Sequence, residues 1–103
     1  MIKIEATRKN GKIISLTVKG HANSAPKGED LVCAAVSSIL VGGCNALKSP
    51  NCYTIKLDSG DASIVEKSTA NEHDYEVLEI MVVQFKTIEE TYGKFLKVIE
   101  KGN

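Results

Sequence analysis

Hydrophobic and polar residues alternate in two segments at the start of the chain, 1–8 and 12–19. Alternation with a period of two is typical of a β-strand that buries one face. Asn10-Gly11 joins the two segments, and this dipeptide favours a tight hairpin turn. The sequence therefore predicts an antiparallel β-hairpin at this point. The apolar residues expected to share its buried face are Ile2, Ile4, Ala6, Ile14, Leu16 and Val18.

A polar loop and a long apolar segment follow the hairpin. Residues 20–30 combine small residues with glycine and proline, which predicts a mobile loop. Residues 31–46 are apolar nearly all round, which predicts a deeply buried helix with Asp30 as its N-cap. The glycines expected to allow the loop to move are Gly20 and Gly28.

The second half of the chain repeats the order of hairpin and helix. Short strands are predicted at 53–58 and 62–67, and a helix at 73–92 begins after polar residues and ends before a glycine. Residues 94–100 favour a final strand over a last turn of helix. The predicted fold is an α+β two-layer sandwich of order ββαββα with a possible final strand. Two helices would cover one face of a mainly antiparallel sheet of four or five strands.

The length and composition fit one globular domain. The chain has 103 residues, so residues 1–103 are expected to form a single domain. With 43% hydrophobic and 25% charged residues, it does not have the composition of a disordered chain. The formal net charge is zero. A protein that binds nucleic acid through bulk positive charge is therefore excluded, and no direct nucleic-acid partner is expected.

The zero net charge hides an uneven distribution along the chain. Residues 1–28 carry a net charge of +5, whereas residues 58–90 carry −7. One interpretation is that the folded protein has two solvated faces of opposite sign. The other is that the acidic face attracts a basic partner. The sequence leaves both interpretations open.

Three cysteines cannot all pair within one chain, and the sequence opens without the features of a signal peptide. Reduced thiols in a cytoplasmic protein are therefore expected, with no disulfide framework. No C-x-x-C pair supports a zinc site, and neither a metal nor another cofactor is expected. The uncharged segment 31–47 contains serine, glycine and asparagine, which favours a buried helix over a membrane span.

One short segment holds the residue types of a thiol nucleophile site. Cys33 would be the third residue of a helix capped at Asp30, where the helix dipole favours a thiolate and free N–H groups can stabilise an oxyanion. His21 can supply the base. The simpler alternative is that Cys33 is a small core residue. Ser37, one helical turn later, can partner the thiol or bond back to its own helix.

The segment from Gly20 to Ser37 fits the pattern G-H-A-x5-G-x-D-x-V-C-A-A-V-S at every fixed position. It resembles the ribosomal-processing cysteine protease family, Prp, and the resemblance extends over the whole chain as a single cysteine protease domain. The resemblance implies a cysteine endopeptidase that removes the N-terminal extension of a large-subunit ribosomal protein by thiolate attack on the peptide carbonyl after an aromatic pair. It implies Cys33 as nucleophile and His21 as general base, with Asp30 and Ser37 in support. It also implies a homodimer.

The helix at 73–92 carries more apolar residues than one stripe against a sheet can bury. Exposure of several large apolar residues together favours a contact between two copies of the chain through this helix. The alternative is that both faces are buried within one subunit. The residues expected to need cover of their own are Leu78, Ile80, Val82 and Val83.

Two functions from other classes compete with the protease. A noncatalytic ribosome-associated binding module would contact RNA through the basic hairpin from Arg8 to Lys12, with Cys33 in the core. RNA-binding sheets of the common type stack bases on aromatic side chains, and neither predicted strand of this hairpin has one. A thiol-redox protein would need a resolving cysteine near Cys33 in the sequence, and there is none.

Overall fold

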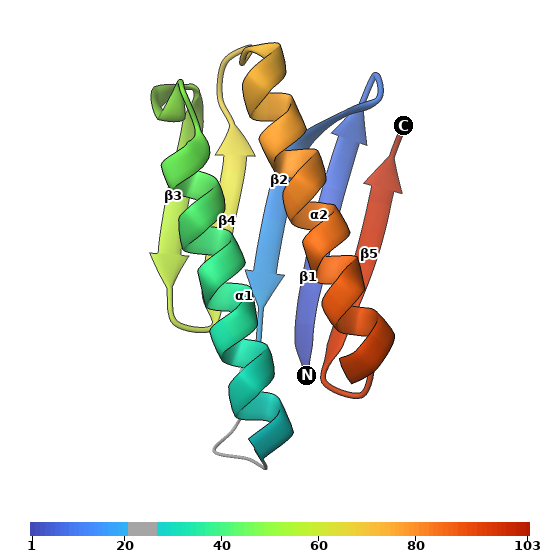
Figure 1. The fold of residues 1–103 in the computed structure, drawn as a ribbon. Helices are drawn as coiled ribbons and strands as arrows, with labels where there is room; N and C mark the ends of the chain where they lie inside the picture. The colour runs from blue at the N-terminus through green and yellow to red at the C-terminus, as the bar shows by residue number, and fades with distance from the viewer. Residues whose placement is uncertain (21–26) are drawn as a thin grey trace.

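In the computed structural model, two pairs of strands are each followed by a helix, and a fifth strand ends the chain. The structure describes residues 1–20 and 27–103, and it describes side chains for residues 1–20 and 31–103. Figure 1 shows both helices on the same face of one sheet. The predicted two-layer α+β fold is therefore confirmed. In chain order the elements are β1 (Ile2–Lys9), β2 (Lys12–Lys19), α1 (Lys27–Ala46), the 3-10 turn η1 (Pro50–Cys52), β3 (Tyr53–Asp58), β4 (Asp61–Glu66), α2 (Glu72–Tyr92) and β5 (Leu96–Gly102).

The sheet has the order β3-β4-β2-β1-β5. Neighbouring strands are antiparallel except at one edge, where β5 runs parallel to β1. The final segment is thus a strand, as predicted. A parallel pair needs a long crossover connection, and the chain returns across the helical face through α2 before it enters β5 (Figure 1).

A β-bulge in the first hairpin changes which residues reach the core. Thr7 pairs with Ser15, but the next residue, Arg8, pairs with Ile13, so Ile14 is the extra residue in β2. A bulge shifts the alternation of side chains by one position. The expectation that Ile14 is buried is therefore wrong, and Ile13 is fully buried in its place.

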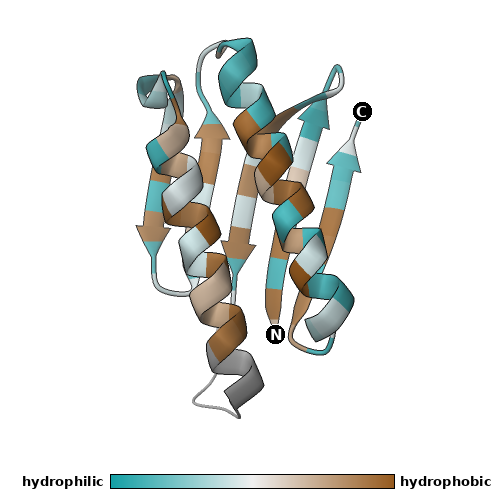
Figure 2. Cartoon of the chain, viewed as in Figure 1, coloured by the Kyte–Doolittle hydropathy of each residue, from teal (hydrophilic) through white to brown (hydrophobic). Residues whose placement is uncertain are grey.

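Helix α1 begins at Lys27, four residues earlier than the pattern of apolar residues predicted. Asp30 therefore lies inside the helix and is not its N-cap, and Gly28 belongs to the helix and not to the loop. The expected deep burial is also wrong, since Leu31 is 61% exposed and Val41 49% exposed. A helix on the outside of a two-layer fold rests on the sheet with one side only, and Figure 2 shows both polar and apolar (brown) segments along the outward side of α1. The buried stripe of α1 is Val32, Val36 and Leu40.

Helix α2 buries a wider stripe than α1 does. Val82 is only 2% exposed, whereas its neighbours Ile80 and Val83 are 56% and 61% exposed. The prediction that Leu78 and Val82 need cover from outside is therefore wrong, because the subunit covers both itself. The fully or almost fully buried apolar residues of α2 are Leu78, Met81, Val82 and Phe85.

A buried carboxylate joins the start of α2 to the loop after α1. Asp74 has no exposed surface, and it accepts hydrogen bonds from the backbone N–H groups of Lys48 at 2.8 Å and Ser49 at 2.9 Å. Its other partners are Nδ1 of His73 at 3.0 Å and Nδ2 of Asn71, the N-cap residue, at 3.4 Å. Burial alone would raise the pKa of Asp74, but these hydrogen bonds outweigh burial and hold the pKa below its ordinary value.

Ion pairs bring the basic and acidic parts of the sequence together. Arg8 binds both Glu79 in α2 and Glu100 in β5, while Lys12 pairs with Glu72 at 2.9 Å. Within the described residues, Arg8, Lys12 and Lys19 of the basic segment therefore each pair with an acidic residue of the segment 58–90. No helix in the ranges that the structure describes is long and apolar enough to cross a membrane.

Candidate active site

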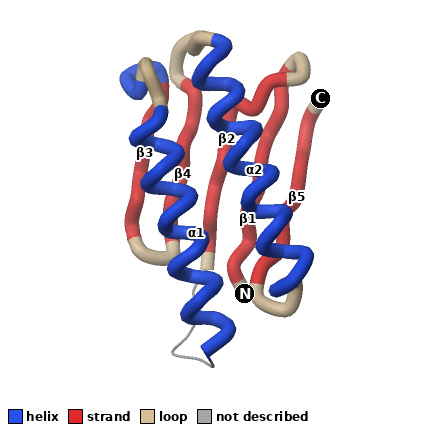
Figure 3. Tube along the Cα trace, in the orientation of Figure 1, coloured by secondary structure: helices blue, strands red, loops and turns tan. Residues whose placement is uncertain are grey.

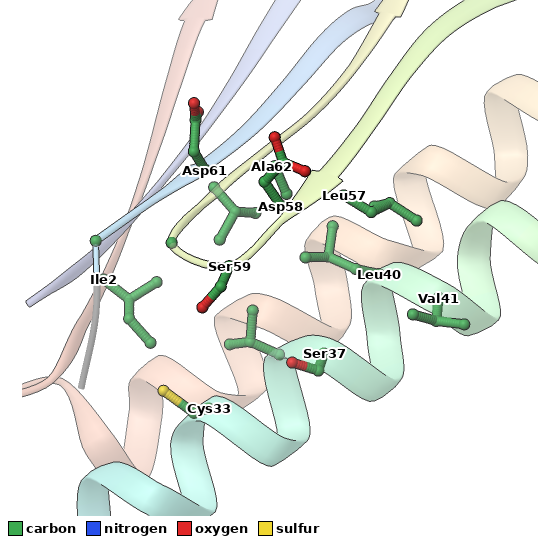
Figure 4. A pocket seen from close by; sticks show the side chains of 14 residues that line it. Ile2, Cys33, Ser37, Leu40, Val41, Leu57, Asp58, Ser59, Asp61 and Ala62 are labelled. Atoms are coloured by element: carbon green, nitrogen blue, oxygen red, sulfur yellow. The ribbon is translucent and has the colours of Figure 1, made fainter. Parts of the chain in front are cut away.

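A pocket of about 440 Å³ lies between α1 and the turn that joins β3 to β4. Figure 4 shows α1 along one side of this pocket and the turn on the opposite side. Part of its wall is apolar, and this part includes Val36 and Leu40 from α1 and Leu57 from β3. Such a wall suits an apolar side chain of a ligand.

Cys33 lines this pocket, is half-buried and packs against the core. Ser37 lines the same pocket, because residues four apart lie on one side of a helix. Cys33 is the seventh residue of α1 and not the third, since the helix begins at Lys27. Its own N–H lies within the helical ladder, and the free N–H groups belong to the first turn, Lys27–Asp30. The predicted position of Cys33 in the first turn is therefore wrong, while its place in a pocket is compatible with a reacting thiol.

The other two cysteines lie outside this pocket, and all three are free thiols. Cys44 is partly buried on α1, and burial raises the pKa of its thiol, which opposes formation of a thiolate. Cys52 has its Sγ 3.7 Å from the carbonyl oxygen of Thr69. Of the three cysteines, Cys33 is thus the one placed to meet a ligand.

The opposite wall of the pocket is the β3–β4 turn, which sequence reasoning did not connect to the site. Figure 4 shows the side chain of Ser59 directed toward α1, while Asp58 and Asp61 point away from the helix. Asp61 binds Lys19 at 2.9 Å and Lys56 at 2.7 Å. These hydrogen bonds, that from Lys19 first, lower the pKa of Asp61 to about 2. The only local signal for this wall was a glycine-containing turn.

Of the predicted site residues, the structure does not describe His21 and describes only the backbone of Asp30. His21 lies outside the described residues, but Gly20, which directly precedes it, lines the pocket together with Cys33. The backbone of Asp30 lies in the first turn of α1, and its side chain is outside the described part. The structure therefore brings Cys33, Ser37 and Gly20 to one pocket. The expected mobility of the loop concerns residues outside the described ranges and stays a prediction.

Comparisons with known proteins, by sequence and by structure, find the same family. The profile of the cysteine protease Prp family matches residues 1–97. The ribosomal processing cysteine protease Prp of Staphylococcus aureus is 31% identical over 104 residues, which cover 95% of this chain and 97% of that protein. The Prp of Bacillus subtilis is 34% identical over 107 residues, covering 95% of this chain and 96% of the relative.

Solved structures agree with this result. A crystal structure of an essential ribosomal processing protease Prp from S. aureus in complex with a substrate peptide has a TM-score of 0.84 and 30% identity, covering 98% of this chain and all of that one. Another crystal structure of the S. aureus protease, with a covalently linked product peptide, has a TM-score of 0.83 at the same identity and coverage. With a family match over nearly its whole length and the same fold as these enzymes, the chain belongs to the ribosomal processing cysteine protease family, Prp.

Proposed function

We propose that this protein is a cytoplasmic endopeptidase that removes the N-terminal extension of a large-subunit ribosomal protein, with Cys33 as nucleophile and His21 as general base. The observation that carries this proposal is the pocket shared by Cys33 and Gly20, the residue that directly precedes His21. A nucleophile and its base must come within hydrogen-bond reach of each other. The residue after β2 and the second turn of α1 both line this pocket.

The chemistry is acyl transfer in two steps. His21 takes the proton of the Cys33 thiol, and the Sγ thiolate attacks the carbonyl carbon of the scissile peptide bond. The C–N bond then breaks, His21 returns the proton to the leaving amine, and the acyl group stays on Sγ as a thioester. In the second step His21 deprotonates a water molecule, which attacks the thioester. The C–S bond breaks, His21 returns its proton to Sγ to restore the thiol, and the extension leaves as a carboxylic acid that loses its proton to water.

The pocket supports a peptide substrate. Its apolar residues favour burial of an apolar side chain next to the attacked carbonyl, while Ser37 provides a hydroxyl one helical turn from Cys33. The S. aureus relatives bind a substrate peptide and a covalently linked product peptide. We assign Ser37 and Asp30 supporting roles, in which they hold substrate or base in place without reacting.

A homodimer is part of the proposal, with the outer faces of the two helices as the contact. Ile80 and Val83 are exposed large apolar residues of α2, and Val41 is one of α1. A second groove of about 260 Å³ between the helices is lined by Gly42 and Ile80, among others. Contact between two copies would remove this apolar surface from water.

The noncatalytic RNA-binding alternative gains no support from the structure. The guanidinium group of Arg8, the expected RNA contact, already donates hydrogen bonds to Glu79 and Glu100. Lys12 is engaged by Glu72 and also lies 5.0 Å from the centre of the Tyr75 ring. These partners compete with phosphate for the same donors.

The experiment that tests the proposal is incubation of the protein with an extended large-subunit ribosomal protein and measurement of the product masses. We expect one cut, and we expect Cys33→Ala and His21→Ala each to abolish it while circular dichroism stays unchanged. Cys52→Ala is the matched control, because Cys52 is half-buried like Cys33 but lies outside the pocket. Near-normal cleavage by Cys33→Ala or His21→Ala would contradict the assignment.

A further inference from the structure

The end of β2 is held by the turn between β3 and β4. The last residue pair between β2 and β4 is Lys19 with Asp61, and their side chains form an ion pair at 2.9 Å. One residue further on, the backbone N–H of Gly20 donates a hydrogen bond to the carbonyl oxygen of Gly60 at 3.1 Å. Two consecutive residues before His21 are therefore attached to this turn.

Gly20 is also confined on its other side. Its φ of +109° lies in a region of backbone conformation that residues with a side chain rarely adopt. A Cβ atom added to Gly20 would lie 2.2 Å from the carbonyl oxygen of Met1. The backbone at Gly20 thus runs between the carbonyl of Met1 and the carbonyl of Gly60, with room for neither a side chain nor a large shift. The direction in which the chain leaves β2 is set at this point.

The turn meets the proposed active site as well as β2. Gly20, Ser59 and Gly60 all line the pocket that contains Cys33. Figure 3 shows the β3–β4 turn at the end of the sheet where β2 stops, and the β1–β2 turn at the opposite end. Gly60 has a φ of +73°, so the shape of the turn depends on a residue that tolerates the left-handed region.

We propose that the β3–β4 turn is a positioning element of the protease: the carbonyl of Gly60 holds Gly20, and so fixes the residue from which the chain continues into His21. This inference rests on the proposed role of His21 as general base. Proton transfer requires a heavy-atom distance within hydrogen-bond reach, and a displacement of about 1 Å can lower the rate by up to about 100-fold. Gly60 acts through Gly20 and is not itself a catalytic residue.

The direct test removes one hydrogen bond and no side chain. The full chain is assembled by joining a synthetic thioester of residues 1–32 to residues 33–103 at Cys33, with the amide N–H of Gly20 replaced by an ester oxygen. The matched control carries the same replacement at Gly11, whose N–H donates to the carbonyl of Asn103 at 2.9 Å at the other end of the sheet. Each protein thus lacks one backbone hydrogen bond made by a glycine.

Three readouts separate positioning from general stability: the midpoint of thermal unfolding, kcat and KM for peptide cleavage, and the pH dependence of Cys33 alkylation by iodoacetamide. We expect the Gly20 ester to lower kcat at least fivefold with KM within about threefold, and to change the pH profile of alkylation. Mass spectrometry of Cys44 and Cys52 adducts gives an internal reference. The Gly11 ester should keep kcat within about twofold of the unmodified chain. Equal activity of the two esters would overturn the proposal.

A second pair of variants decides the matter if the ester proteins do not refold. Gly60→Val disfavours the positive φ, whereas Gly60→Asn tolerates it. We expect the Val variant to have a kcat at least about fivefold lower than that of the Asn variant. Equal losses in both would show that a side chain obstructs the pocket, which contradicts the proposal. If His21→Ala cleaves normally, the proposed function itself fails; if only the turn variants are normal, the positioning role alone fails.

Discussion

Replacement of Asp74 by asparagine tests how strongly one buried carboxylate stabilises this fold. Asp74 accepts the N–H groups of Lys48 and Ser49, one on each carboxylate oxygen. The asparagine side chain has nearly the same shape, but one oxygen becomes an NH2 group. One of these backbone donors would then face another donor inside the protein.

The magnitude follows from these contacts. A buried donor left without an acceptor costs about 1–3 kcal/mol, and the remaining bonds lose the contribution of a charged acceptor. We therefore expect Asp74→Asn to lower the free energy of unfolding by about 2–4 kcal/mol at pH 7. For a chain of this size that corresponds to a fall in the unfolding midpoint of about 10–25 °C.

The loss should depend on pH in a defined direction. The pKa of Asp74 is lower in the folded protein than in the unfolded chain, so the carboxylate contributes its full stabilisation above the unfolded pKa, about 4. That contribution is lost as the pH falls from there through the lower folded pKa. The difference between wild type and Asp74→Asn should therefore be largest near neutral pH and should shrink in acid.

Urea denaturation followed by circular dichroism, from pH 7 down to about pH 3, measures both quantities. Asp58→Asn is the control, because Asp58 is an exposed carboxylate with one long contact, to Lys56 at 3.8 Å. The control should differ from wild type by less than about 0.5 kcal/mol at every pH. The reasoning is wrong if Asp74→Asn lowers the free energy of unfolding at pH 7 by no more than the control does. It is also wrong if the loss of stability in Asp74→Asn does not become smaller in acid.

The remaining predictions concern α2 and the first hairpin. Val82→Glu should not fold, because it places a charge in the core at a cost of several kcal/mol, whereas Val83→Glu should fold normally. Analytical ultracentrifugation of Val83→Glu then tests the homodimer: a dimer as stable as the wild type would move the contact away from α2. Arg8→Ala should lower the free energy of unfolding by about 1–2 kcal/mol, since it removes the ion pairs that the Arg8 guanidinium group makes with two partly exposed carboxylates. Urea titrations at low and high salt check this, and a loss that high salt does not reduce would argue against an electrostatic origin.

Local pattern determined most of the secondary structure. Alternation of apolar residues together with Asn10-Gly11 predicted the first hairpin, and Asn10 and Gly11 do adopt the positive φ angles that a two-residue turn of this kind needs. Polar residues before residue 73 predicted the start of a helix, and Asn71 among them is the N-cap of α2. These features depend on interactions within a few residues, so the sequence contains them directly. The motif from Gly20 to Ser37 likewise pointed to the right family.

Periodicity alone was not enough where a second element decides the environment. The apolar residues of α1 predicted burial on all sides, but Leu31 and Val41 are exposed because the sheet covers one side of the helix only. The bulge at Ile14 and the start of α1 at Lys27 were missed for a related reason. The bulge depends on which backbone groups of β1 are available as partners, and the first turn of α1 consists of the polar residues Lys27–Asp30, so the pattern of apolar residues records neither.

Only the tertiary structure decided what faces Cys33. The β3–β4 turn reaches the pocket because β4 pairs with β2, which places Gly60 beside Gly20 although forty residues separate them in the sequence. Their contact joins a backbone N–H to a backbone carbonyl, and almost every residue in the chain carries both groups. A contact of this kind leaves no signature in residue types. The sequence could therefore propose a nucleophile and a base by their chemistry, whereas the turn that faces Cys33 across the pocket was set by strand pairing.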